Sequence, residues 1–279
     1  MAAKLVLPGV GLITGAASGI GRTTALAFAS AGCKSLALVD LNESGLEETR
    51  RLVNNLLDSA GSAANIQTYK VDVTSPNSVS DAYASVKEKF GRLDYSVHAA
   101  GIVSFDGSST TTPVESFDRL NNVLYRGVWL CSKEALKIMR SQSLDSEAFP
   151  SESVHPLRAQ RGSIVNVSSA LGLLSQANSP VYCAAKAALL GLTRSDAIDH
   201  ALDRIRVNAI LPGLVDSPMG DTPQEIVDLI HNHVIPRTPL KREALREEIA
   251  DTIVYLASNK ASYVTGASWA VDGGLTAGY

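Results

Sequence analysis

The chain has 279 residues, of which 45% are hydrophobic and 19% are charged, with a mean hydropathy of +0.08. This composition supports a large buried core and excludes disordered and fibrous classes of protein. The formal net charge of -3 leaves no basic excess for binding nucleic acid or an anionic membrane surface.

The three cysteines, Cys33, Cys131 and Cys183, are odd in number and lie far apart in the chain. This usage fits neither a disulfide framework nor a metal site, so it predicts a reducing compartment and no bound metal. A proline and two glycines interrupt the apolar run at residues 5–13, and no later stretch is as long as the ~18 apolar residues that a membrane span needs. We therefore expect a soluble, cytoplasmic protein.

Short β-branched apolar runs alternate with longer segments of helical periodicity. Strands are predicted at Val10–Ile13, Ser35–Asp40, Ile66–Asp72, Leu93–His98, Ser163–Val167, Arg206–Ile210 and Trp269–Val271. Helices are predicted at Ile20–Ser30, Glu43–Ser59, Ser78–Phe90, Val114–Arg140, Val181–Leu202, Pro223–His233 and Glu243–Leu256. The alternation predicts a single doubly wound, Rossmann-type α/β domain over residues 1–279, with a parallel seven-stranded sheet and helices on both faces. Ligands in this architecture bind at the carboxyl ends of the strands.

A glycine-rich turn at residues 14–22 follows the first strand and leads directly into a helix, with the spacing G-x-x-x-G-x-G. Glycine lets the backbone approach a pyrophosphate, and a helix N-terminus supplies N–H donors and positive potential. No Lys-Ser or Lys-Thr pair follows, which disfavours a Walker-type loop. The turn predicts dinucleotide binding, and the alternative is tight packing alone. Its predicted contact residues are Gly15, Ser18, Gly19, Ile20 and Gly21.

Asp40 ends the second predicted strand, about 20 residues after the glycine turn. A carboxylate there can accept both hydroxyls of an adenosine ribose and would repel a 2′-phosphate, which favours NAD(H) over NADP(H). Two points keep NADP(H) open as the alternative. Asp40 could instead cap the next helix, and the cation Arg22 lies nearby in sequence.

Three side chains that can act on an alcohol or carbonyl follow the fifth strand. Ser169 lies just after it, and Tyr182 and Lys186 share one face of the next helix because they are four residues apart. A lysine ammonium can stabilise a tyrosinate and lower the pKa of the phenol, as a general acid/base requires. Ser169 would hold the substrate oxygen. Together the three side chains predict acid/base catalysis.

Together these motifs resemble the short-chain dehydrogenase/reductase family. Thr14–Gly21 matches its glycine turn, and Ser169, thirteen residues before Tyr182, matches its serine. The resemblance covers essentially the whole chain. Further matches are Asp72-Val73, Gly101, Pro212-Gly213, Val264-Thr265-Gly266 and Val271-Asp272-Gly273-Gly274.

The resemblance implies a full set of cofactor contacts and an assembly of two or four copies of the chain. Asp72 and Val73 would border the adenine, Ala100 and Gly101 the ribose, Val215 the nicotinamide carboxamide, and Ser217 the phosphates, with Pro212 and Gly213 beside them and Tyr182 and Lys186 on the nicotinamide ribose. For Asp72 and for Pro212-Gly213, the alternative is loop geometry alone.

The sequence departs from the family pattern at two places. His98-Ala99-Ala100-Gly101 stands where the family has Asn-Asn-Ala-Gly, and we interpret His98 as a partly buried residue bonded to backbone. Leu124 replaces a helical asparagine that helps hold a water near the lysine, and leucine offers no hydrogen bond. Asn121 is the better substitute for that asparagine, because it lies one turn away on the same face and Asn122 does not. We expect Leu124 to shape a specialised pocket.

Two segments are predicted to lie outside the basic fold. Residues 141–162 form a surface insertion, which looks similar to relatives from fungal secondary metabolism. Residues 216–240 correspond to the family's substrate lid, whose apolar side chains, Met219 among them, suggest a lipophilic ligand.

The sequence thus predicts an NAD(H)-dependent oxidoreductase that moves a hydride between nicotinamide and a secondary alcohol or ketone of a lipophilic small molecule, in polyketide or terpenoid tailoring. Tyr182 would be the acid/base, Lys186 would orient the ribose and tune Tyr182, and Ser169 would steady the oxyanion. One alternative is a non-redox isomerase, dehydratase or cyclase that uses Tyr182 beside a bound nicotinamide cofactor. Another is a nucleotide-sensing module without catalysis.

Overall fold

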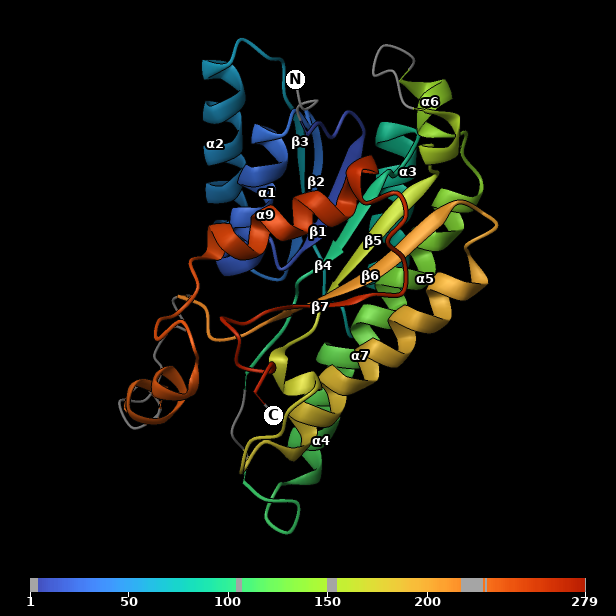
Figure 1. Cartoon of the computed structure of the whole chain (residues 1–279). Helices are drawn as coiled ribbons and strands as arrows, with labels where there is room; N and C mark the ends of the chain where they lie inside the picture. Colours follow the sequence, from blue (N-terminus) through green and yellow to red (C-terminus); the bar gives the residue numbers. More distant parts are fainter. Residues whose placement is uncertain (1–4, 104–106, 150–154, 217–227, 229, 279) are drawn as a thin grey trace.

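Seven parallel strands form one sheet in the centre of the molecule (Figure 1). The structure is a computed structural model, and it describes residues 5–103, 107–149, 155–216, 228 and 230–278. The strands are β1 (Val10–Thr14), β2 (Ser35–Asp40), β3 (Asn65–Lys70), β4 (Tyr95–His98), β5 (Gly162–Val167), β6 (Ile205–Pro212) and β7 (Ser268–Val271). Their order in the sheet is β3-β2-β1-β4-β5-β6-β7, which confirms the predicted doubly wound domain.

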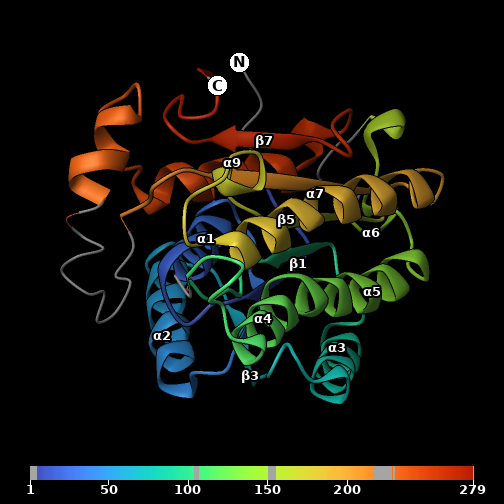
Figure 2. The same cartoon turned by 90° about the horizontal axis from the view of Figure 1, so that it is seen from below.

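Helices cover both faces of this sheet (Figure 2). On one face lie α1 (Gly19–Ser30), α2 (Glu43–Ser59) and α9 (Arg246–Ala257), and on the other lie α3 (Pro76–Phe90), α4 (Val114–Asn121), α5 (Gly127–Arg140) and α7 (Pro180–Asp199). The chain changes face where β3 is followed by α3 and β4, so the strand order reverses between β1 and β4. This switch point is where doubly wound folds bind ligands.

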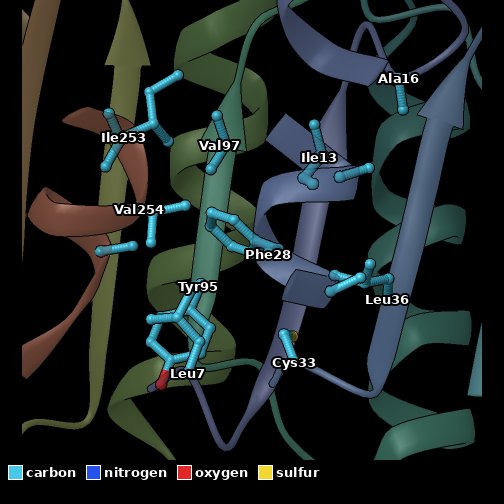
Figure 3. Close-up of a cluster of buried hydrophobic side chains, with 14 of the residues drawn as sticks. Leu7, Ile13, Ala16, Phe28, Cys33, Leu36, Tyr95, Val97, Ile253 and Val254 are labelled. Carbon is cyan, nitrogen blue, oxygen red and sulfur yellow. The ribbon is translucent and has the colours of Figure 1, made fainter. Parts of the chain in front are cut away.

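The strands alternate their side chains between two cores. Ile13 and Leu36 enter the core under α1 and α9, which Figure 3 shows, whereas Leu12 and Ala37 enter the core on the other side. Within the first core, Phe28 meets Tyr95 edge-on, with ring centres 5.9 Å apart. Because both faces of the sheet are covered, every residue of β1, β4, β5 and β6 is buried.

Several predicted boundaries are wrong by a few residues. The third strand ends at Lys70, so Asp72 lies in the loop after it, and the last predicted helix begins at Arg246. The helix predicted over Val114–Arg140 is interrupted by a π-helical turn, Asn122–Arg126, because an extra residue is accommodated between α4 and α5. The helix predicted at Pro223–His233 lies mostly outside the described residues, and its described end belongs to a π-helical turn at Ile230–Val234.

The described parts of the predicted insertion at 141–162 are fastened to the amino ends of the strands. The insertion carries the short helix α6 (Asp145–Ala148). The carboxamide of Gln142 bonds to both the N–H and the carbonyl of Leu93, and the carboxylate of Asp145 accepts the N–H of Gln160 at 3.0 Å. This attachment lies at the opposite end of the sheet from the glycine turn.

Candidate active site

A cavity of about 570 Å³ opens at the carboxyl ends of β1 to β6. It brings together the turn after β1, the ends of the next strands and the start of α7. Every predicted cofactor and catalytic residue that the structure describes lines this cavity: Gly15, Ser18, Gly19, Ile20, Gly21, Asp40, Asp72, Val73, Ala100, Gly101, Ser169, Tyr182, Lys186, Pro212, Gly213 and Val215. The two remaining predicted contact residues, Ser217 and Met219, lie outside the described residues.

The glycine turn can accept a pyrophosphate. Gly15 has φ +71°, and a Cβ there would lie 2.8 Å from the backbone of Ala99, so a side chain has no room. A Cβ on Gly21 would overlap the carbonyl oxygen of Gly15. Ser18 is the N-cap of α1, and its side chain makes no capping bond within the described part of the chain. The first N–H groups of α1 therefore face the cavity and suit the diphosphate of a dinucleotide.

Asp40 and Arg22, the two residues that bear on the choice of cofactor, differ in their access to the cavity. The Asp40 carboxylate accepts N–H groups from Ala17 at 3.1 Å and Asn42 at 3.0 Å and still borders the cavity. The N-cap of α2 is Asn42, so the alternative reading of Asp40 as a helix cap is wrong. The Arg22 guanidinium bonds to Thr49 and to the Ala17 carbonyl, and Arg22 is not among the lining residues.

Tyr182 and Lys186 meet inside the cavity. The Lys186 ammonium donates to the Val167 carbonyl at 2.8 Å and lies 5.8 Å from the centre of the Tyr182 ring. Burial lowers the pKa of Lys186 from 10.5 to about 8. Burial also raises the pKa of Tyr182, and a hydrogen bond with Ser169 acts in the opposite direction. The lowering of the Tyr182 pKa by Lys186 stays a prediction.

One wall of the cavity near Tyr182 is apolar. Leu124 is fully buried in the π-helical turn and belongs to a small cluster against which Val181 and Tyr182 pack. A Cβ on Gly101 would lie 3.4 Å from its side chain, so Leu124 sits beside the loop after β4. Asn121, the proposed substitute for the missing asparagine, is not among the lining residues.

His98 lies beneath the cavity in a network of side chains. It is 1% exposed, and its ring contacts Asn166 at 2.8 Å and Ser96 at 2.9 Å. Burial lowers the pKa of His98 to about 4, so the ring is neutral at physiological pH. The prediction of a partly buried His98 bonded to backbone is wrong, because side chains of β4 and β5 supply its partners. Thr14 fixes the loop above, accepting the N–H groups of Ala99 and Ala100.

The sequence analysis missed several lining residues, and two of them are polar side chains near the start of α7. Gln176 and Ser179 lie between β5 and α7 and face the same cavity as Tyr182. The spacing could have indicated Ser179, because it precedes Tyr182 by three residues and so lies near it at the start of the helix.

Comparison with known proteins decides the family. A model of the family described as short chain dehydrogenase matches residues 10–226. The chain belongs to the short-chain dehydrogenase/reductase family. Among its short-chain dehydrogenase relatives is fogB of Aspergillus ruber, which is 37% identical over 273 residues, or 97% of each chain. The cis-4-hydroxycyclohexanecarboxylate dehydrogenase of Sinomonas cyclohexanicum is 38% identical over 269 residues, or 96% of each chain.

Solved structures of this family share the fold. The crystal structure of levodione reductase superimposes with a TM-score of 0.84 at 32% identity, covering 98% of this chain and 100% of that one. Like its relatives, this short-chain dehydrogenase is an oxidoreductase. Among its described helices, none is long and apolar enough to cross a membrane. The described residues also contain no group of three or more His, Cys, Asp or Glu side chains that could hold a metal ion.

Proposed function

We propose that the chain is an NAD(H)-dependent oxidoreductase that transfers a hydride between nicotinamide and a secondary alcohol or ketone of a lipophilic small molecule. The observation that carries the proposal is the meeting of Ser169, Tyr182 and Lys186 in a cavity that continues to the glycine turn and Asp40. This continuity joins a candidate dinucleotide site to a candidate catalytic site at the carboxyl ends of the strands.

The proposed roles follow from the contacts of each side chain. The nicotinamide, when bound, supplies or accepts the hydride. Tyr182 gives a proton to the substrate oxygen in reduction and takes it back in oxidation, and Ser169 holds that oxygen. Lys186, anchored on the Val167 carbonyl, orients the ribose and returns the proton to Tyr182. The apolar side chains around Leu124 exclude water from the reacting carbon.

The preference for NAD(H) is part of the proposal. In the proposed complex the Asp40 carboxylate would lie beside the adenosine ribose, and it would repel a 2′-phosphate of the same charge. Arg22 would be the cation for that phosphate, but its guanidinium is bonded to Thr49 and Ala17. These contacts support NAD(H) over NADP(H).

The relatives support a proposal about the type of metabolism in which the reaction takes place. The similarity to fungal short-chain dehydrogenases such as fogB supports a place in the tailoring of a polyketide or terpenoid. Relatives named for cis-4-hydroxycyclohexanecarboxylate and for levodione support a small-molecule substrate. We further propose a cytoplasmic homodimer or homotetramer.

Cofactor binding tests the proposal without a known substrate. Titration with NADH and with NADPH, followed by fluorescence, is expected to show tighter binding of NADH. Asp40→Asn should narrow this preference, because it removes the charge that repels the phosphate, whereas Asp58→Asn at the exposed end of α2 should not change it. Binding of neither dinucleotide would contradict the proposed function, and a preference for NADPH would contradict the role of Asp40.

A non-redox reaction is the second candidate, and Leu124 is the observation that favours it. A leucine in the π-helical turn removes the hydrogen-bonding group that the family places near the lysine, while Tyr182 keeps its position. An isomerase, dehydratase or cyclase would form product with no change in nicotinamide absorbance. An absorbance screen with ketones and alcohols distinguishes the two candidates.

A further inference from the structure

Ser179 is a buried hydroxyl without a partner inside the substrate cavity. The residue is 3% exposed, and its Oγ has no hydrogen-bond partner among the residues that the structure describes. It lines the same cavity as Ser169 and Tyr182. The Oγ itself lies in the cavity wall with almost no accessible surface. Buried hydroxyls are almost always hydrogen-bonded in folded proteins, so an unpartnered one on a residue that borders a cavity indicates a group that a ligand satisfies once rotation about χ1 turns the Oγ toward it.

The helix start does not explain this serine. Ser179 is the N-cap of α7, a position where serine commonly accepts a backbone N–H of the first turn. Its side chain makes no such bond within the described part of the chain. By contrast, Ser75 at the start of α3 accepts the N–H of Ser78. The Ser179 hydroxyl is thus free for another acceptor or donor.

A second polar group lines the same cavity. Gln176 is partly buried, lines the same cavity, and makes no side-chain hydrogen bond with the described residues. A carboxamide and a hydroxyl can each donate and accept. Ser179 precedes Tyr182 by three residues, so it lies near the reacting position and not at the adenosine end. Gln176 belongs to the same segment between β5 and α7.

The charges around the cavity restrict what these groups can bind. Its charged lining residues in the described part of the chain are Asp40, Asp72 and Lys186. The two carboxylates follow β2 and β3, which lie three and four positions from β5 in the sheet. The Lys186 ammonium is bonded to Val167, and the proposed function assigns its remaining donors to the ribose and to Tyr182. A carboxylate or phosphate bound at Ser179 would therefore have no cation of its own. A neutral oxygen suits the two groups better.

We propose that Ser179 and Gln176 bind a second, neutral oxygen of the substrate, which makes the preferred substrates hydroxyketones, diketones or the corresponding diols. One oxygen reacts between Ser169 and Tyr182, and the other accepts or donates a hydrogen bond at Ser179. This inference rests on the proposed function and adds to it a class of substrate.

Matched pairs of ketones test the inference. The probes are 3- and 4-hydroxycyclohexanone, each compared with the methylcyclohexanone substituted at the same position, with NADH as the reductant. The wild type should reduce at least one hydroxyketone with a higher kcat/KM than its methyl counterpart. Ser179→Ala should lower kcat/KM for that hydroxyketone by about tenfold and leave the methylcyclohexanone unchanged. Ser195→Ala, an exposed serine on the same helix, should change neither.

Two results would overturn the inference and leave the proposed function standing. The first is a wild-type enzyme whose kcat/KM is no higher for the hydroxyketones than for the methylcyclohexanones. The second is a Ser179→Ala variant in which kcat/KM falls equally for both ketones of a pair. NADH titration of Ser179→Ala should match the wild type, which shows that the cofactor site is intact. A wild type that binds neither dinucleotide would overturn the proposed function, and this inference with it.

Thermal stability supplies a readout that needs no substrate. Because the Ser179 hydroxyl has no partner to lose, Ser179→Ala should melt at the wild-type temperature or higher. A clear fall in Tm would show that the hydroxyl bonds within the protein and would overturn the inference.

Discussion

At the amino ends of the strands two buried charged side chains are each bonded several times over, whereas at the carboxyl ends two buried polar side chains have one bond or none. Asp94 accepts three hydrogen bonds from Arg92 and one from the N–H of Val10. Arg206 donates to Gln160 and to the carbonyls of Ala257 and Ser258 at the end of α9. At the other end, Lys186 has one bond, to the Val167 carbonyl, and Ser179 has none in the described part of the chain.

This difference indicates that the polar groups at the amino ends stabilise the fold and that those at the carboxyl ends bind ligands. A polar group that is fully bonded within the protein stabilises the fold and has no capacity left for a ligand. A group left with free bonding capacity in a cavity costs stability and can be satisfied by substrate or cofactor. His98 follows the first rule although it lies at the carboxyl end of β4, because it supports the loop and does not line the cavity.

The largest expected effect is on turnover. Tyr182→Phe should lower kcat about 10²- to 10⁴-fold, since it removes the proton that general acid/base catalysis moves. The melting temperature should stay close to that of the wild type. Steady-state kinetics with a responsive ketone and a thermal melt check both parts. Tyr263→Phe, fully exposed on the surface, is the matched control and should retain activity. Full activity in Tyr182→Phe would refute its role.

A substitution at the amino ends of the strands should lower stability and leave activity unchanged. Asp94→Ala leaves Arg92 unpaired and the Val10 N–H without its acceptor, so it should lower the free energy of unfolding by about 3–5 kcal/mol. Activity per folded molecule should stay unchanged. Urea unfolding and an assay below the transition measure the two quantities. Asp81→Ala, exposed on α3, should leave both unchanged. A loss of activity without loss of stability would break the comparison.

Much of the fold and of the cavity lining was predictable from local sequence. Short apolar runs and their alternation identify the strands, and the glycine spacing and the Tyr182–Lys186 spacing locate the cavity residues, because these signals lie within a few neighbouring residues. The network around His98 was not predictable, since Ser96 and Asn166 reach it from different strands.

Two site features depend on tertiary structure in the same way. The π-helical turn that carries Leu124 arises where the helix packs on α7 and the loop after β4, and a regular helical period does not reveal it. The unpaired state of Ser179 is a property of its surroundings. A sequence shows the serine but not the absence of a partner.

The pH dependence of the free energy of unfolding should reveal the buried charge of Lys186. The pKa of Lys186 is lowered from 10.5 to about 8, so the unfolded chain binds more protons between these values. Its destabilising contribution is complete below pH 8 and disappears as the pH rises to 10.5. Lys186→Met should therefore be more stable than the wild type at neutral pH by up to about 3 kcal/mol, and the gap should close with rising pH.

Urea unfolding of both proteins from neutral pH to pH 10 measures this gap. Lys89→Met, exposed on α3, should show no such pH-dependent difference. A constant gap between wild type and Lys186→Met would contradict the burial of a charged ammonium.

The smallest expected effect concerns the apolar wall. Leu124→Asn should raise KM for apolar ketones by about tenfold, because it removes buried apolar surface beside Tyr182, and it should alter the pH profile of turnover. Leu120→Asn, in the same cluster but outside the cavity lining, should destabilise the fold with less effect on KM. If Leu124→Asn left turnover, pH profile and product distribution unchanged, Leu124 would have no role in the pocket.

Isotope transfer tests the central claim most directly. Purified protein is incubated with a ketone that it converts and with NADH that carries deuterium in the transferable position of the nicotinamide. The mass of the product is then measured by mass spectrometry. Hydride transfer predicts an alcohol that gains one deuterium at the carbinol carbon while NADH is consumed. Product that forms without deuterium and without loss of NADH would contradict an oxidoreductase and favour a non-redox reaction in the same cavity.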